Sequence, residues 1–219
     1  MKLGVLFSGG KDSTLALHKM AKKNRIECLI TLNSKNKESY MFHTPNINIT
    51  ELQSESLGIP LIKKGTKGNP EEELIDLEEA IIEAIKQFGI KGIVTGAIES
   101  IYQSKRIQKI CNKLGLLCIN PLWKKDQESI LRESIQEGYK IIISGIFAYP
   151  LTKSWLGKQI DNEMINQLLI LNKKFGLSIS GEGGEIETTV LDAPLFTKTI
   201  EINDFHIKAK NNSGIFTIT

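Results

Sequence analysis

The sequence predicts an α/β protein, with a doubly wound parallel sheet followed by a smaller C-terminal α+β part. Short apolar runs alternate with helical segments over residues 1–121, as is typical of parallel strands joined by crossover helices. A Gly-Gly turn links the first apolar run to the first helical segment. The regular alternation of strands and helices ends near residue 121. A length of 219 residues suits one large domain with an appendage. We therefore expect two domains, residues 1–121 and residues 122–219.

The first part should contain alternating strands and helices. The strands are expected at residues 2–7, 27–32, 60–64, 91–95 and 116–119. The first helix should begin at Asp12, where apolar residues start to recur at helical spacing. Thr50 and Gln53 have the spacing of a capping box and predict the start of the second helix, which Gly58 should end. A third helix should start at the cap Asn69 and end at Gly89, because Pro70 and an acidic first turn favour a helix start.

The second part mixes helices with antiparallel strands. Residues 126–137 and 161–175 are expected to be helical, and the β-branched run at residues 141–143 is expected to be a strand. A glycine-rich acidic loop follows at residues 180–185. Residues 199–219 resemble a hairpin that turns at residues 212–214.

Composition excludes several classes of protein. Hydrophobic residues make up 41% and charged residues 24%, which argues against a disordered or fibrous chain. The 28 Lys and Arg and 25 Asp and Glu leave a net charge of +3, so we expect no stable nucleic-acid binding. No run approaches the roughly 20 apolar residues of a membrane span, and no signal-peptide core develops. The odd number of cysteines, three, without a two-residue gap between any pair, favours a reducing, cytoplasmic location.

The most informative motif lies directly after the first expected strand. It comprises Ser8, Gly9, Gly10, Lys11, Asp12, Ser13 and Thr14. Such a turn exposes backbone N–H groups to an anion, and the positive end of the following helix dipole favours the same charge. The hydroxyls can donate to phosphate, Lys11 can balance charge on the leaving oxygens, and Asp12 can help to hold Mg²⁺. We therefore predict a phosphate-binding loop.

Two other motifs that contain a lysine in such a loop are excluded. A Walker loop needs Ser or Thr after the lysine and Gly six residues before it, but Asp12 and Val5 occupy these positions. The S-x-x-K motif of penicillin-binding enzymes is present at Ser8, but S-D-N and K-T-G are absent from the chain.

Residues 8–13 read SGGKDS and resemble the pyrophosphate-binding loop of the N-type ATP pyrophosphatases, which split ATP into AMP and pyrophosphate. The resemblance implies a HUP-like sheet of order 3-2-1-4-5, with ATP at the point where strand order reverses. The phosphate loop and the loop after the fourth strand should then face each other across the nucleotide. The nucleotide-binding residues implied outside the phosphate loop are Thr31 and Leu32 near adenine, and Gly96, Ala97, Ser100 and Gln103 after the fourth strand. By itself, the latter segment also suits an ordinary strand-to-helix turn capped by Ser100.

Further segments resemble, in order, the diphthine:ammonia ligase (diphthamide synthase) family over almost the whole chain. They are residues 38–46, 96–103 with Arg106, 155–157, 181–188 and 192–196. The family converts the carboxylate of diphthine on translation elongation factor 2 to the amide of diphthamide, using ATP, Mg²⁺ and ammonium. The implied route is an acyl adenylate, with release of AMP and pyrophosphate. Lys158 departs from the pattern, since Arg is expected there.

The resemblance implies roles for acids and aromatics, because ammonium and the quaternary ammonium of diphthine are both cations. The catalytic residues implied are Lys11, Asp12, Glu182 and Glu185. Ammonium could be bound by Glu182, Glu185 or Glu187. The substrate-binding residues implied are Tyr40, His43, Tyr102, Arg106, Trp155 and Glu187. For Glu187 a solvated loop charge, and for Trp155 a core side chain, is as compatible with the sequence as a functional role, whereas for Glu185 a functional role is favoured. His43 is also compatible with a structural role.

Other functions remain open at this point. A tRNA-modifying thiolase shares the loop but usually brings a reactive cysteine pair or a basic appendage, and a glutamine-dependent synthetase needs a glutaminase domain. A non-catalytic ATP-binding sensor would need neither Lys11 and Asp12 nor the acidic loop. The sequence leaves open whether the protein is a homo-oligomer.

Overall fold

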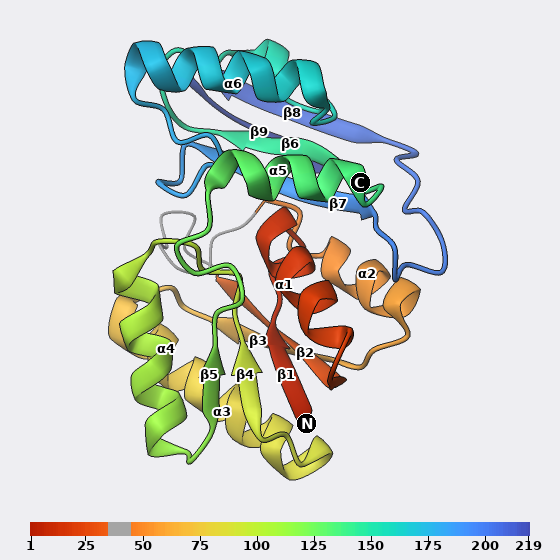
Figure 1. Cartoon of the computed structure of the whole chain (residues 1–219), viewed down its shortest axis with the longest axis vertical. Coiled ribbons are helices and arrows are strands. Elements are labelled where there is room, and N and C mark those ends of the chain that lie inside the picture. The colour runs from red at the N-terminus through yellow and green to blue at the C-terminus, as the bar shows by residue number, and fades with distance from the viewer. Residues whose placement is uncertain (35–44) are drawn as a thin grey trace.

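The computed structural model describes residues 1–34 and 45–219 as two sheets with flanking helices (Figure 1). The first sheet is parallel, and its strand order is β3-β2-β1-β4-β5, which confirms the predicted order 3-2-1-4-5. Its strands are β1 (Lys2–Leu6), β2 (Arg25–Ser34), β3 (Leu61–Thr66), β4 (Gly92–Val94) and β5 (Leu117–Ile119). Four helices connect them: α1 (Lys11–Ala21), α2 (Ile49–Leu57), α3 (Pro70–Phe88) and α4 (Ile101–Lys113).

The second sheet is antiparallel, in the order β7-β6-β9-β8. Its strands are β6 (Lys140–Ile146), β7 (Ile186–Asp192), β8 (Phe205–Lys210) and β9 (Ser213–Ile218). The helical elements of this part are α5 (Gln127–Gln136), the short 3₁₀ helix η1 (Lys153–Trp155) and α6 (Asn162–Phe175). Figure 1 shows this sheet, with α5 and α6, stacked above the parallel sheet.

Two hydrophobic clusters cover the two faces of the parallel sheet. One packs α3 and α4 against strand residues such as Ile30 and Ile93. The other joins Leu3, Val5 and the α1 residue Leu15 to side chains of β6 such as Ile141, and it continues through the second sheet. The antiparallel sheet is therefore packed onto the α1 side of the parallel sheet, and α1 is buried between them.

Several predicted boundaries are corrected. The first helix begins at Lys11 and not at Asp12. The predicted capping box does not form, because Thr50 Oγ1 donates to Ile47 O and Gln53 reaches away from its own helix. The hairpin turns one residue earlier than predicted: Lys210 pairs with Ser213, so Asn211 and Asn212 form the turn. Strand β7 was not predicted.

Other helix ends agree with the sequence. Gly58 and Gly89 end α2 and α3 in the left-handed conformation. Asp126 and Asp161 cap α5 and α6 through hydrogen bonds from Ser129 N and Met164 N. The helices in the described ranges include none that is long and apolar enough to cross a bilayer.

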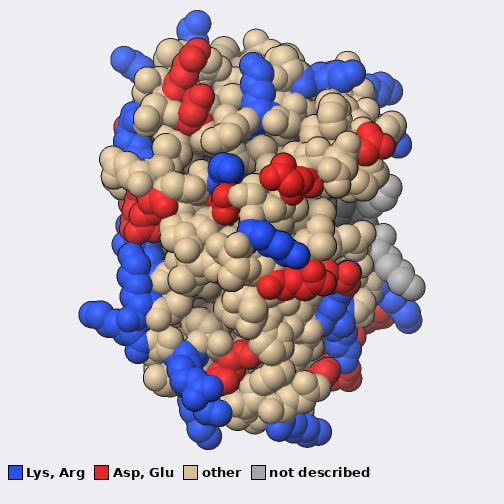
Figure 2. All heavy atoms as spheres, turned by 90° about the vertical axis from the view of Figure 1, so that its right-hand side faces the viewer, with Lys and Arg blue, Asp and Glu red and all other residues tan. Residues whose placement is uncertain are grey.

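Charged side chains of both signs are interspersed on the surface. Figure 2 shows one face, on which Lys and Arg alternate with Asp and Glu.

Candidate functional site

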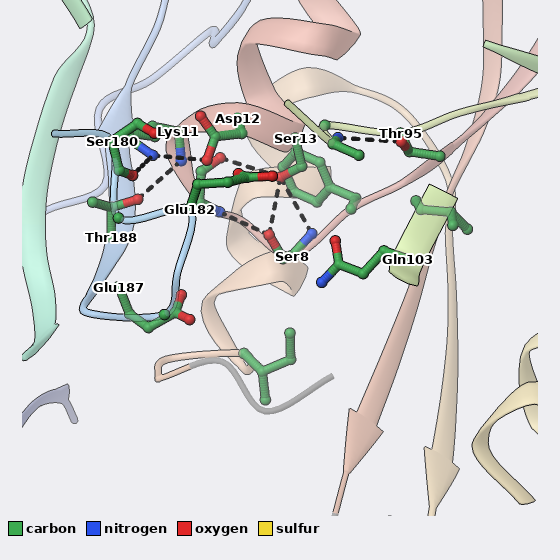
Figure 3. A pocket seen from close by; sticks show the side chains of 18 of the residues that line it. Ser8, Lys11, Asp12, Ser13, Thr95, Gln103, Ser180, Glu182, Glu187 and Thr188 are labelled. Atoms are coloured by element: carbon green, nitrogen blue, oxygen red, sulfur yellow. Dashed lines mark hydrogen bonds and ion pairs between the residues drawn. The ribbon is translucent and has the colours of Figure 1, made fainter. Parts of the chain in front are cut away.

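A cavity of about 450 Å³ opens at the carboxyl ends of β1 and β4, beneath the loop that precedes β7. This position is where ligands bind in doubly wound sheets, and the volume is that of a small-molecule pocket. Its lining residues are Leu6, Phe7, Ser8, Gly10, Lys11, Asp12, Ser13, Ile30, Leu32, Ile47, Leu77, Thr95, Gly96, Ala97, Gln103, Ile107, Phe147, Ser180, Gly181, Glu182, Gly183, Gly184, Ile186, Glu187 and Thr188. Figure 3 shows the polar members of this set converging from both sheets.

The predicted phosphate loop forms the turn between β1 and α1. Gly9 adopts a φ of 76°, which favours glycine. Ser8 Oγ and Ser13 Oγ lie 3.2 Å apart, and Gly10 N donates to Ser8 Oγ at 3.4 Å. Lys11 N donates to Thr188 Oγ1 at 3.2 Å, so β7 lies directly against the loop. The backbone turn and the helix N-terminus that the sequence predicted are therefore both present.

Gln53 fastens this loop from behind. It is fully buried on α2, and its Nε2 donates to Gly9 O at 2.9 Å and to Val190 O at 2.8 Å. A Cβ on Gly9 would lie 2.3 Å from Gln53 Oε1. The side chain thus holds the loop and β7 together, and position 9 tolerates only glycine.

Lys11 and Asp12 form an ion pair at the start of α1. Lys11 Nζ donates to Asp12 Oδ2 at 2.7 Å and also to Ser180 O. Burial raises the pKa of Asp12, while Lys11 lowers it and Glu182 raises it. Asp12 Oδ1 is buried and has no hydrogen-bond partner among the described residues. A buried carboxylate oxygen without a partner is an available ligand for a cation.

This donor set fits Mg²⁺ that is bound together with phosphate. Among the residues that the structure describes, no group of three or more His, Cys, Asp or Glu side chains could hold a metal alone. Mg²⁺ in nucleotide sites is usually held by one or two carboxylates, phosphate oxygens and water. Asp12 Oδ1, with the Ser8 and Ser13 hydroxyls on the same loop, meets this requirement.

The loop after β4 packs directly on the start of α1. A Cβ on Gly96 would lie 2.7 Å from both Asp12 C and Ser13 N, so only glycine fits this approach. Ala97 N donates to Thr95 Oγ1 at 3.2 Å, which shapes the same loop. The structure therefore brings the two predicted nucleotide-binding loops together.

An apolar wall completes the lower part of the cavity. Its side chains are Leu6, Ile30, Leu32, Leu77 and Ile107. Leu32 lines the cavity as predicted, but Thr31 does not, because successive strand residues point to opposite faces. Thr31 Oγ1 instead donates to Phe7 O at 2.6 Å.

Glu182 joins the loop before β7 to the loop after β4. Its Oε1 accepts hydrogen bonds from the backbone N–H groups of Ile98, Glu99 and Ser100, at 3.3, 2.8 and 3.0 Å. These groups lie just before α4, where the helix dipole stabilises a negative charge. Glu182 lines the cavity, and one of its oxygens is thus engaged in holding two loops together.

Glu185 and Glu187 differ in position. Glu185 does not line the cavity, and its Oε1 accepts from Ser178 N at 3.1 Å within the glycine-rich loop. Glu187, on β7, does line the cavity, and its carboxylate is directed into it (Figure 3). The pKa of Glu187 is raised to about 7, mainly by burial, while Lys11 lowers it and Asp12 raises it.

Other predicted site residues lie away from the cavity lining. Thr14 Oγ1 donates to Gly10 O at 2.8 Å, and Ser100 Oγ caps α4 by accepting from Gln103 N at 3.3 Å. The Arg106 guanidinium stacks over the Tyr102 ring at 3.5 Å, one turn along α4. Trp155 is half-buried and packs against the core. Tyr40 and His43 lie outside the described residues, so the predictions for them are not tested.

Sequence reasoning missed several residues of the site. Phe147, after β6, Ser180, in the loop before β7, and Thr188, on β7, line the cavity. Gln53, on α2, does not line it but bonds to the loop that does. Thr188 lies in a stretch rich in β-branched residues, 186–192, which is a signal typical of a strand. Phe147 follows a β-branched run and carries no local signal for a site.

Comparisons with known proteins give a consistent result. The family model for the diphthamide synthase N-terminal domain matches residues 1–118, and that for the C-terminal domain matches residues 126–219. A diphthine–ammonia ligase of Schizosaccharomyces pombe is 34% identical over 98% of this chain, which spans 38% of that protein. The Mus musculus diphthine–ammonia ligase is 34% identical over 93% of this chain and 83% of its own length.

Solved structures show a weaker likeness. A predicted subunit of a tRNA methyltransferase from Methanocaldococcus jannaschii is 20% identical, with a TM-score of 0.46. The likeness covers 89% of this chain and 98% of the other.

Proposed function

Because the chain belongs to the diphthamide synthase family, we propose that it catalyses the ATP-dependent amidation of diphthine on elongation factor 2, with ammonium as the nitrogen donor. The observation that carries the proposal is that two features of the cavity meet at the start of α1. The buried, unpartnered Asp12 Oδ1 and the Lys11 ammonium lie on one side, and the Gly96 loop lies against the same helix start. A triphosphate bound there would be held at both loops.

The reaction requires activation of a carboxylate, which is a poor electrophile. The diphthine carboxylate attacks the α-phosphorus of ATP and displaces pyrophosphate, giving an acyl adenylate. Ammonia then attacks the acyl carbon and displaces AMP. Such a reaction depends mainly on positioning and on charge stabilisation.

The side chains divide these tasks. The Ser8 and Ser13 hydroxyls and the N-terminus of α1 bind the departing pyrophosphate. Lys11, whose Nζ donates to Asp12 Oδ2 and to Ser180 O, balances the negative charge of the pyrophosphate. Asp12 would hold Mg²⁺, which would supply further charge neutralisation to the phosphate oxygens. The apolar wall around Leu32 packs against adenine.

The proposal is tested by incubating the protein with ATP, Mg²⁺, ammonium and diphthine-bearing elongation factor 2. We expect AMP in step with a mass change of the factor from carboxylate to amide. ADP as product, or AMP formed only with a tRNA acceptor, would contradict the proposal. No nucleotide cleavage at all would favour an ATP-binding sensor.

Asp12→Asn gives a sharper test of the site, because asparagine keeps the shape but removes the charge. AMP release should fall by about a hundredfold or more, while the thermal midpoint stays close to that of the wild type. Asp76→Asn, on α3 and outside the cavity lining, is the matched control and should keep full activity. Equal activity of the two variants would remove Asp12 from the mechanism.

A further inference from the structure

The three acidic side chains around the loop before β7 are in different bonding states. Glu182 Oε1 accepts three backbone N–H groups, and Glu185 Oε1 accepts one. Within the part of the chain that the structure describes, the Glu187 carboxylate makes no hydrogen bond and no ion pair, although it lies in the cavity wall. Glu185 Oε2 is also without a partner among the described residues, but Glu185 does not line the cavity. Of the three, Glu187 is therefore the one that lines the cavity with neither carboxylate oxygen engaged.

An aromatic ring lies beside Glu187. A Cβ placed on Gly145 would be 2.8 Å from Phe147 Cε2 and 3.0 Å from Glu187 Cβ. The Phe147 ring and the Glu187 Cβ therefore both border the space above Gly145, which pairs with Glu187 between β6 and β7. Phe147 also lines the cavity. A carboxylate next to an aromatic ring is a suitable environment for a cation.

We propose that Glu187, with the Phe147 ring beside it, binds the ammonium ion and accepts its proton. The inference rests on the proposed function. An unpartnered carboxylate needs a hydrogen-bond donor, and ammonium offers N–H groups on every side, whereas a quaternary ammonium offers none. Glu187 is thus matched to the nitrogen donor and not to the methylated nitrogen of diphthine.

The electrostatic surroundings agree with this role. The charged groups that act on Glu187 are Lys11 and Asp12 on α1. Its raised pKa, about 7, suits a group that takes a proton at neutral pH and releases it again.

In the proposed step, two protons leave the nitrogen and the acyl group is transferred from AMP to ammonia. Ammonium transfers one proton to the Glu187 carboxylate and becomes neutral ammonia. Its lone pair forms a bond to the acyl carbon, and the bond between that carbon and the AMP oxygen breaks. The nitrogen then loses a second proton to water, leaving the amide and AMP, and Glu187 returns its proton to solvent.

Measurements on the variant Glu187→Gln separate the use of ammonium from the adenylation step. ATP–pyrophosphate exchange, which needs the diphthine-bearing factor but no ammonium, should stay within about twofold of the wild type. Amide formation from ammonium at neutral pH should fall by about a hundredfold. Hydroxylamine, which is largely uncharged at neutral pH, should still yield the hydroxamate at the wild-type rate.

The outcomes distinguish the two proposals. Unchanged amidation in Glu187→Gln, or equal losses with ammonium and hydroxylamine, would overturn the role of Glu187. Absence of exchange in the wild type would instead contradict the proposed function. Glu201→Gln, an exposed glutamate outside the cavity, is the matched control and should behave as the wild type in all three assays.

A second variant tests the ring. Phe147→Leu keeps an apolar side chain but removes the aromatic face. We expect the KM for ammonium to rise by roughly threefold to thirtyfold, with kcat for hydroxylamine unchanged. An unchanged KM for ammonium would show that the ring takes no part in binding the cation.

Discussion

Among the individual residues, Gln53 shows how burial changes the meaning of a motif. Its spacing from Thr50 predicts a capping box, but its amide points away from α2 and bonds to two backbone carbonyls. These carbonyls, on Gly9 and Val190, belong to the phosphate loop and to β7. The buried amide therefore bonds to the loop and to β7, and it does not cap its own helix.

We expect Gln53→Ala to destabilise the protein by about 2–4 kcal/mol, because it removes two buried hydrogen bonds and opens a cavity. Urea unfolding followed by circular dichroism measures the change. Gln87→Ala is the matched control, since the Gln87 side chain bonds to Glu83 on the exposed face of α3. A loss for Gln53→Ala no larger than that for the control would contradict the clamp.

Among the structural elements, the loop before β7 is attached to both halves of the cavity. Ser180 O accepts from Lys11 Nζ on α1, and Glu182 Oε1 accepts from the three N–H groups that precede α4. The loop contains Gly181, Gly183 and Gly184, of which the first and last have positive φ. Glycines give the loop its tight course, and its two polar contacts hold it over the cavity.

Glu182→Ala should release this attachment. The amide hydrogens of residues 98–100 should exchange with deuterium about 5- to 100-fold faster, as expected for the loss of charge-assisted hydrogen bonds. Hydrogen–deuterium exchange with mass spectrometry measures this directly. Exchange in α3 should not change, and equal acceleration there would indicate general destabilisation and not a local release.

Across the molecule as a whole, the two sheets share one hydrophobic cluster, and a buried histidine reinforces the junction. His18, on α1, bonds through Nδ1 to the Tyr139 hydroxyl, and its Nε2 accepts from Leu195 N at 3.3 Å. An Nε2 that accepts must be unprotonated. Burial lowers the pKa of His18 to about 4, so the ring is neutral in the folded protein at neutral pH.

This burial predicts a pH-dependent stability. The unfolded chain binds a proton at His18 below its ordinary pKa of 6.5, but the folded protein binds it only near pH 4. The contribution of neutral His18 to the free energy of unfolding is therefore complete above pH 6.5 and is lost as the pH falls to 4. Its size is on the order of 3 kcal/mol.

Comparison with His18→Gln isolates this effect, because all other titrating groups are common to both proteins. The free energy of unfolding of the wild type minus that of the variant should fall as the pH is lowered from 6.5 to 4. Chemical denaturation at a series of pH values measures it. A difference independent of pH would show that His18 is not held neutral by the fold.

The strand order of the parallel sheet was implied by the resemblance to the ATP pyrophosphatases, whereas its alternating strands and helices and the turn before α1 could be predicted from the residues themselves. The latter features depend on local signals: apolar periodicity, Pro70 and Gly89 at helix ends, and the Gly9-Gly10 turn before a helix. Each signal is formed by residues that lie close together in the chain, so it can be recognised directly in the sequence.

Which side chains meet in the cavity depends instead on long-range packing. Strand β7 joins the second sheet through pairing with β6, and this pairing brings Thr188 against Lys11 and turns Glu187 into the cavity while Glu185 stays in its loop. Close packing between distant elements selects these contacts, and it cannot be obtained from residue spacing alone.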